Sequence, residues 1–227
     1  MVARGDLGTE IPSEMLPIVQ KRMIKTCRRM GKIAIVATEM LETMMENMRP
    51  KRAETSDIAN AVFDGTDAVM LSGETTIGKH PIETVRAMAN ICETAEKYAE
   101  FNYEPSKNNI TTAIARSVVD SVELLDAKLI CAATMSGDTA RIISNLKPNA
   151  KILALCPDEK TGRRLALNWG VYPCPVGTMD STDEIINVAK EKAVKFANLE
   201  KDDNIVITGS FPKHEAKHTN LLKIEQI

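Results

Sequence analysis

Residues 67–75 read Asp-Ala-Val-Met-Leu-Ser-Gly-Glu-Thr, and this stretch decides the fold class. A short apolar run over 68–71, typical of a buried β-strand, is followed by a hydroxyl, a glycine that permits a sharp turn, and a carboxylate. Helical patterns stand on either side of it, over 52–63 and 81–101. Short strands that alternate with helices predict parallel strands joined in βα units.

The same order of strand and polar residues occurs twice more in the first hundred residues. The run Met-Val-Ala-Arg-Gly-Asp-Leu-Gly over 1–8 puts Gly5 and Asp6 directly after a short strand at 1–4. Residues 37–42, Ala-Thr-Glu-Met-Leu-Glu, follow a strand over 32–37 and are predicted to open a helix. Because the carboxyl ends of parallel barrel strands present catalytic groups at one end, three such strands indicate one shared site.

Each of these motifs also has a local interpretation. Residues 5–8 fit a simple turn in which Asp6 hydrogen-bonds its own backbone, which is the commoner case for such residues alone. The Thr38 hydroxyl fits a helix N-cap as well as an anion site at a helix N-terminus. An exposed Asp6 carboxylate is well placed to hold a divalent cation. The three motifs together favour the functional interpretation.

The pattern divides the chain into two domains of an α/β protein. A polar stretch with a proline at 102–107 separates domain 1–102 from domain 103–227. The first holds only three strand–helix units, which leaves open sheet edges, so we expect a partial (β/α)8 TIM-barrel arc. The second fits an open doubly wound α/β domain.

The remaining expected strands are 127–132, 151–155, 171–174, 204–208 and 220–225, and the remaining helices are 13–30, 109–125, 139–146, 159–168 and 181–198. Ser13 and Thr182 are the expected starts of two helices, and Gly31 and Gly170 the expected stops.

Composition limits the classes of partner. With 29 basic and 31 acidic residues the net charge is -2, so no overall positive field attracts nucleic acid or an anionic membrane. The five cysteines are scattered without a CxxC pair, and we expect reduced core thiols. No apolar run approaches the roughly 20 residues of a spanning helix, and the first residues lack the order of a secretion signal, so the expectation is a cytoplasmic protein.

A second candidate site lies in the second domain. Residues 134–141, Thr-Met-Ser-Gly-Asp-Thr-Ala-Arg, follow an expected strand and enter a helix, and four of them are candidates for holding a phosphate: Thr134, Ser136, Gly137 and Thr139. The same residue types also suit a capped βα turn without a ligand. An acidic residue at Asp138 repels phosphate.

The quoted motifs carry a family resemblance. The runs MVARGDLG, ATEMLE and RAETSDIANAVFDGTDAVMLSGET resemble the second portion of the pyruvate kinase barrel, and the rest of the chain resembles that family's C-terminal regulatory domain. The resemblance implies phosphoryl transfer between phosphoenolpyruvate and ADP, giving pyruvate and ATP in glycolysis. It also implies dependence on Mg²⁺ (or Mn²⁺) and K⁺, a phosphorylated allosteric effector, and a homo-oligomer that is usually a tetramer.

The resemblance also implies roles for particular residues. Asp6 would be one of two carboxylate ligands of the magnesium ion, and Gly5, Asp6 and Thr38 would bind the substrate, Gly5 through its N–H. Thr38 and Ser72 would be catalytic, with Ser72 in a proton-relay network, and the loop 134–139 would hold the effector's phosphate. The family's catalytic lysine, second metal carboxylate and potassium ligands precede the MVARGD motif. We therefore expect this chain to be a fragment that is inactive alone.

Two functions remain open at this point. The chain is either part of a pyruvate kinase enzyme, or a phosphometabolite-binding regulatory and oligomerisation module whose main support is the loop 134–139. Trp169 resembles a tryptophan near the effector site, although simple packing explains it equally well, and the loop 209–214 is a candidate to close over a ligand.

Overall fold

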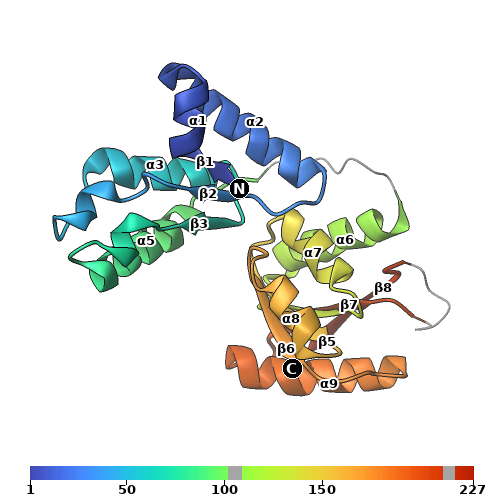
Figure 1. Ribbon diagram of the computed structural model, residues 1–227. Coiled ribbons are helices and arrows are strands. Elements are labelled where there is room, and N and C mark those ends of the chain that lie inside the picture. Colours follow the sequence, from blue (N-terminus) through green and yellow to red (C-terminus); the bar gives the residue numbers. More distant parts are fainter. Residues whose placement is uncertain (102–108, 212–217) are drawn as a thin grey trace. The chain divides into compact units, whose positions relative to one another are not determined.

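The computed structural model describes residues 1–101, 109–211 and 218–227, drawn in Figure 1. The chain separates into two units, Met1–Asn102 and Tyr103–Ile227, and each is described by itself. In the described ranges, no helix has both the length and the apolar character needed to cross a bilayer.

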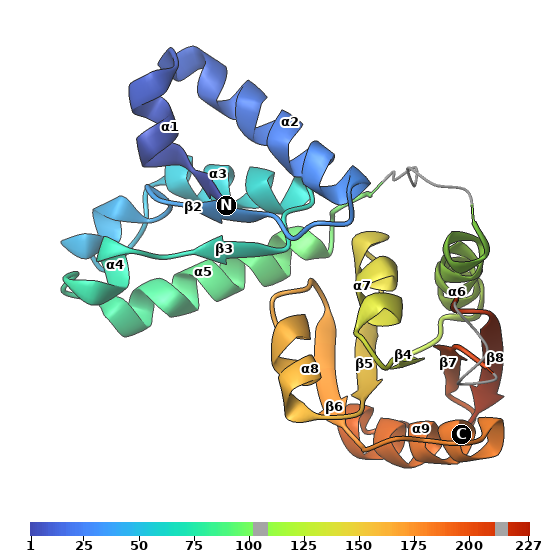
Figure 2. The same ribbon diagram turned by 45° about the vertical axis from the view of Figure 1, so that its right-hand side comes forward.

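A three-stranded parallel sheet forms the centre of the first unit. Its strands are β1 (Val2–Ala3), β2 (Ile35–Ala37) and β3 (Ala68–Met70), in that order across the sheet. The register pairs Val36 with Val2 on one side and with Val69 on the other. The first helices after the three strands are α1 (Arg4–Glu10), η2 (Glu42–Met45) and α4 (Gly73–Thr76). Figure 2 shows α1 and α4 at the same end of the sheet.

Three longer helices pack on the sheet: one between β1 and β2, one between β2 and β3, and one after β3. They are α2 (Leu16–Arg29), which follows the short η1 (Ser13–Met15), then α3 (Arg52–Phe63) and α5 (Pro81–Glu96). Ile24, Ile58 and Met88, one from each helix, lie in a single core with Val36 of β2. Full burial of side chains of this size stabilises a fold by about 1.5–3 kcal/mol each. The unit therefore has the layered packing of a βα arc.

The second unit is a five-stranded sheet with helices on both faces. Its strands are β4 (Leu129–Ala133), β5 (Lys151–Cys156), β6 (Val171–Pro175), β7 (Asn204–Gly209) and β8 (Leu221–Gln226), in the order β6-β5-β4-β7-β8 with only β8 antiparallel. Its helices are α6 (Ile110–Leu125), α7 (Asp138–Asn145), α8 (Glu159–Leu165) and α9 (Thr182–Ala197). One core joins α6, α7 and α8 to one face, and another joins α9 to the opposite face. This is the doubly wound arrangement that the sequence predicts.

The structure confirms the α/β class and most of the expected elements. The helix over 52–63 has the expected bounds, whereas the helix expected over 81–101 ends at Glu96. Ser13 opens the 3₁₀ turn η1 and not the long helix, which begins at Leu16. At α9 the cap is Ser181 and not Thr182, because the Ser181 hydroxyl accepts the Glu184 N–H at 3.1 Å.

Two local expectations and one alternative interpretation are wrong. No α-helix opens at 37–42, because Thr38 and Glu39 have φ values of 70° and 53°, which are outside the helical range, and the helix that begins at Glu42, η2, is a short 3₁₀ helix. Residues 5–8 are not a turn, because α1 begins directly after β1. Gly170 does not end α8, which stops at Leu165, and instead lies directly before β6.

Candidate functional site

The ends of β1 and β2 bring Gly5 and Thr38 into contact. The Gly5 N–H donates to the Thr38 Oγ1 at 2.8 Å, and the Thr38 hydroxyl donates to the Ala37 carbonyl at 2.5 Å. Gly5 lies in the first turn of α1, where N–H groups have no acceptor inside the helix. The structure thus joins two of the residues that the sequence places in one site, and they share a hydrogen bond.

Asp6 stands next to this pair and is exposed. In the part of the chain that the structure describes, its carboxylate makes no hydrogen bond or ion pair, and its backbone carbonyl accepts the Thr9 hydroxyl at 2.8 Å. No group of three or more His, Cys, Asp or Glu side chains suited to a metal occurs within the described ranges. A free carboxylate oxygen is a ligand that Mg²⁺ prefers, so Asp6 fits the role of a single protein ligand.

The end of β3 contributes Ser72 and Glu74. Ser72 precedes α4, and its Oγ is buried without a hydrogen-bond partner among the described residues. Glu74 is 3% exposed, and its carboxylate accepts the Ser72 N–H at 2.7 Å and the Leu41 N–H at 3.1 Å. Glu74 therefore ties the segment after β3 to the segment after β2.

Arg4 joins the segments after β1 and β2. It is 4% exposed, and its guanidinium donates to the carbonyls of Thr38 and Glu39 and pairs with Asp57 of α3. Sequence reasoning assigned no role to Arg4 or Glu74. The available signal was their place inside the motifs, where a charged residue beside a buried strand must find a partner within the fold.

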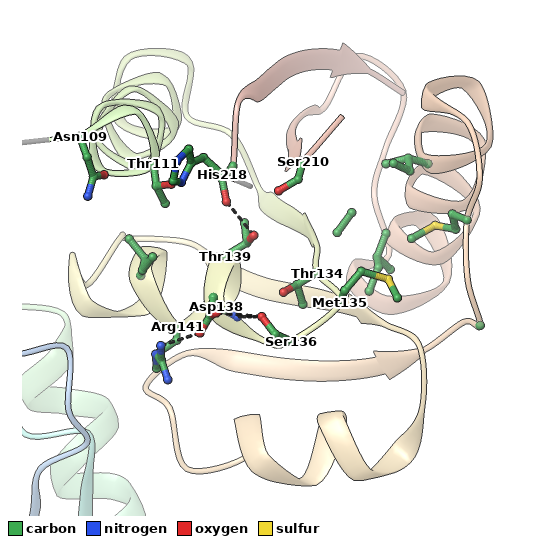
Figure 3. A pocket seen from close by; sticks show the side chains of 17 residues that line it. Asn109, Thr111, Thr134, Met135, Ser136, Asp138, Thr139, Arg141, Ser210 and His218 are labelled. Atoms are coloured by element: carbon green, nitrogen blue, oxygen red, sulfur yellow. Dashed lines mark hydrogen bonds and ion pairs between the residues drawn. The ribbon is translucent and has the colours of Figure 1, made fainter. Parts of the chain in front are cut away.

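The second unit contains a cavity of about 440 Å³ at the carboxyl end of β4 (Figure 3). Three of the four residues that the sequence offers as candidates for holding a phosphate line it: Thr134, Ser136 and Thr139. Its wall also includes Arg141, which carries a positive charge, and two residues from distant parts of the chain, Asn109 and His218. Arg141 ends the run 134–141 but was not among its four candidates for holding a phosphate, and Asn109 was missed because it lies far from this loop in the sequence.

Hydrogen bonds inside the loop 134–139 change the expected roles. Gly137 does not line the cavity, and its N–H donates to the Thr134 hydroxyl inside the loop at 2.9 Å. The Ser136 hydroxyl donates to the Asp138 carboxylate at 2.9 Å, and Asp138 in turn accepts from Arg141 at 2.5 Å. Thr139 and Thr219 share a hydrogen bond of 2.8 Å between their hydroxyls. Asp138 thus binds the Ser136 hydroxyl and the Arg141 guanidinium, the same groups that a bound anion would use.

Two further sequence observations have structural outcomes. Trp169 does not line the cavity, and the Lys147 ammonium lies 5.3 Å from the centre of its ring. Residues 212–214 of the expected closing loop lie outside the described residues, whereas Ser210 lines the cavity.

The cysteines are free thiols, and Cys131 and Cys156 are buried. Burial raises the pKa of the Cys131 thiol to about 12, with the nearby Cys174 adding to the rise. A thiol with so high a pKa is a poor nucleophile near neutral pH. Cys131 is therefore a core residue, as the composition suggested.

Comparisons with known proteins agree with both units. A family model described as "Pyruvate kinase, barrel domain" matches residues 1–85, and one described as "Pyruvate kinase, alpha/beta domain" matches residues 112–225. A pyruvate kinase of Clostridium perfringens is 46% identical over 235 residues, covering 100% of this chain and 50% of that protein. One of Geobacillus stearothermophilus is 45% identical over 233 residues, covering 100% of this chain and 40% of that protein.

A solved structure supports the same conclusion. The crystal structure of a pyruvate kinase from Cryptosporidium parvum aligns with a TM-score of 0.88 at 36% identity, over 99% of this chain and 46% of that one. The chain spans half or less of the length of these relatives. With both units matched by its models, the chain belongs to the pyruvate kinase family.

Proposed function

We propose that the first unit contributes part of the active site of a phosphotransferase that moves the phosphoryl group of phosphoenolpyruvate to ADP, giving pyruvate and ATP in glycolysis. The observation that carries the proposal is the contact between the Gly5 N–H and the Thr38 hydroxyl at 2.8 Å, beside the exposed Asp6. Membership of the pyruvate kinase family supports it.

Gly5 and Thr38 are suited to bind a substrate carboxylate. Each now uses its hydrogen within the protein, Gly5 toward Thr38 and Thr38 toward the Ala37 carbonyl. A carboxylate seated beside them would accept both hydrogens, and charge-assisted bonds of this kind are stronger than the neutral bonds they replace. Binding at these two donors fixes the orientation of the substrate, which is the main protein contribution to phosphoryl transfer.

Asp6 would hold the magnesium ion, or manganese in its place. The bound ion would neutralise negative charge on the phosphoryl and enolate oxygens. Asp6 supplies one carboxylate, and the family resemblance places the second carboxylate, the lysine and the potassium ligands before the MVARGD motif. Ser72 would belong to a proton relay to the enolate, since its buried Oγ has no partner among the described residues.

A chimera tests this function. The part of the Clostridium perfringens pyruvate kinase that precedes the matched region is joined to this chain, and pyruvate formation is followed in a coupled assay with Mg²⁺ and K⁺. We expect turnover in the chimera and none from these 227 residues alone. Asp6→Asn should lower kcat/KM by about 10²-fold or more, while the control Glu10→Gln, at an exposed position at the end of α1, should have little effect.

The outcomes separate the two parts of the proposal. Turnover by this chain alone that Asp6→Ala abolishes would show that the site is complete and that a catalytic lysine was overlooked. A chimera that folds, binds ADP and makes no pyruvate would count against the phosphotransferase itself.

The second candidate function is a regulatory and oligomerisation module, and the cavity of about 440 Å³ in the second unit favours it. Thr134, Ser136 and Thr139 would bind a phosphorylated effector there.

Calorimetry with inorganic phosphate and with a sugar phosphate tests this on the chain as it is. Asp138→Ser should strengthen binding, because it removes the carboxylate that occupies Ser136 and Arg141. Unchanged weak binding would leave the cavity without an anionic ligand. We further propose that the protein is cytoplasmic and forms a homo-tetramer, as its membership of the pyruvate kinase family implies.

A further inference from the structure

The turn after β2 has a backbone conformation that its residues disfavour. Thr38 has a φ of 70° and Glu39 a φ of 53°, so two successive non-glycine residues are left-handed. A Cβ atom makes this conformation unfavourable, above all in a β-branched residue such as threonine. A turn of this kind persists only where its surroundings hold it.

Arg4 supplies the contacts that hold the turn. Its Nε and Nη2 donate to the Thr38 carbonyl at 3.1 and 2.8 Å, and Nη2 also donates to the Glu39 carbonyl at 2.8 Å. The same Nη2 lies 2.9 Å from the Met40 sulfur, and Nη1 pairs with Asp57. A guanidinium presents its donors in a rigid fork, which a lysine ammonium lacks. One buried side chain therefore binds the carbonyls of both left-handed residues.

These contacts set the position of a functional hydroxyl. Arg4 binds the Thr38 carbonyl, and Gly5, the next residue in the chain, donates its N–H to the Thr38 Oγ1 at 2.8 Å. Two successive residues therefore contact Thr38 from opposite ends, its backbone and its side chain. We infer that Arg4 is a positioning residue that locks the Thr38–Glu39 turn and thereby pairs the Thr38 hydroxyl with the Gly5 amide. Only one part of the inference rests on the proposed function, namely that the Thr38 hydroxyl and the Gly5 amide bind a substrate carboxylate.

Amide hydrogen exchange measured by NMR on the 227-residue chain tests the inference. Arg4→Lys keeps a positive charge opposite Asp57 but loses the fork. The Gly5 amide should then exchange at least about tenfold faster relative to the Val36 amide in the middle of β2. The matched variant Asp57→Asn removes the ion pair of the buried Arg4, which lowers stability generally, but keeps the fork, so the ratio of the two exchange rates should change by less than about twofold.

A second substitution rescues the first. Glu39 is exposed and left-handed, and glycine adopts a positive φ without a steric cost. Adding Glu39→Gly to Arg4→Lys should therefore restore much of the Gly5 protection. A purely structural role for the buried charge predicts no such rescue, so a double variant with unimproved protection overturns the inference.

Two further results would overturn it. One is an equal acceleration of Gly5 and Val36 in Arg4→Lys, which would show a general loss of stability. The other is a set of carbon chemical shifts in the unmutated chain that place Thr38 and Glu39 outside the left-handed region, a measurement that requires no variant to fold. Failure of the phosphotransferase proposal would leave all of these results unchanged, because none of them measures turnover.

Discussion

Two glycines of the second unit hold left-handed backbone conformations. Gly137 has a φ of 93° between β4 and α7, and a Cβ added there would lie 3.0 Å from Leu165 Cδ2. Gly170 is also left-handed, with a φ of 68°, but a Cβ added there would meet nothing within 4 Å. The two glycines therefore separate backbone strain from steric contact.

Alanine at these two positions measures the two effects. Gly170→Ala should cost about 1 kcal/mol, from the left-handed backbone alone. Gly137→Ala should cost about 2–3 kcal/mol, because the side chain of Leu165 must also move. Urea unfolding followed by the fluorescence of Trp169, the one tryptophan of the chain, reports on this unit. Equal losses in the two variants would show that contact with Leu165 has no effect.

The sequence predicted which residues meet at the strand ends but not how they meet. Gly5 and Thr38 could be placed together because parallel strands end at one edge of a sheet. The conformation of Thr38 could not be predicted, since it depends on Arg4, which is 34 residues away in the chain. The hydrogen bond from the Gly137 N–H to Thr134 was also missed. Residues that suit a helix cap can bind a ligand or hydrogen-bond within their own turn, and the sequence does not distinguish the two.

At the scale of elements, local signals gave correct bounds where the helix ends are satisfied locally. The helix α3 is the clearest case, because Glu54 accepts the Lys51 N–H at 2.8 Å at its start and also the Thr43 N–H at 2.8 Å. The helix α1 was missed, because two glycines in seven residues give it a low intrinsic propensity. It follows directly from β1 and lies over the strand ends, which is a property of the tertiary fold.

Glu54 makes the stability of the first unit sensitive to acid. Burial alone would raise the pKa of its carboxyl group, but hydrogen bonds from Thr43 and Lys51 outweigh burial and hold the pKa below its usual value. A carboxyl group with a lowered folded pKa stabilises the fold above its unfolded pKa, about 4.3 for glutamate, and this stabilisation is lost as the pH falls through the folded value.

Glu54→Gln tests this contribution. At neutral pH the substitution should lower the free energy of unfolding by about 1–2 kcal/mol, since it weakens charge-assisted hydrogen bonds. The difference between Glu54→Gln and the unmutated chain should shrink as the pH falls below about 4. The control Glu93→Gln changes an exposed glutamate of α5. A loss that does not depend on pH would contradict the assigned cause.

At the scale of the whole molecule, the two units differ in how completely their sheets are covered. The first has three strands, and every residue of β3 is partly exposed. The second has five strands, and every residue of β4 is buried between helices on two faces. Open sheets with few strands have low independent stability. The second unit should therefore be the more stable one.

Production of residues 103–227 alone tests this difference. The shortened chain should unfold cooperatively in urea, because its cores lie within these residues. Its unfolding midpoint should be close to the midpoint that the fluorescence of Trp169 reports for the full chain. Limited proteolysis of the full chain should cut first before Asn102. Loss of the unfolding transition in the shortened chain, or uniform resistance of the full chain, would contradict this account.

The most direct test of the central claim, that the ends of β1 and β2 bind a substrate carboxylate, is the steady-state kinetics of Thr38→Val in the chimera. The substitution removes the hydroxyl bonded to Gly5 and keeps the shape of the side chain. We predict that kcat/KM for phosphoenolpyruvate falls by about tenfold or more while the KM for ADP stays unchanged. Unchanged kinetics for phosphoenolpyruvate, or equal losses for both substrates, would contradict the claim.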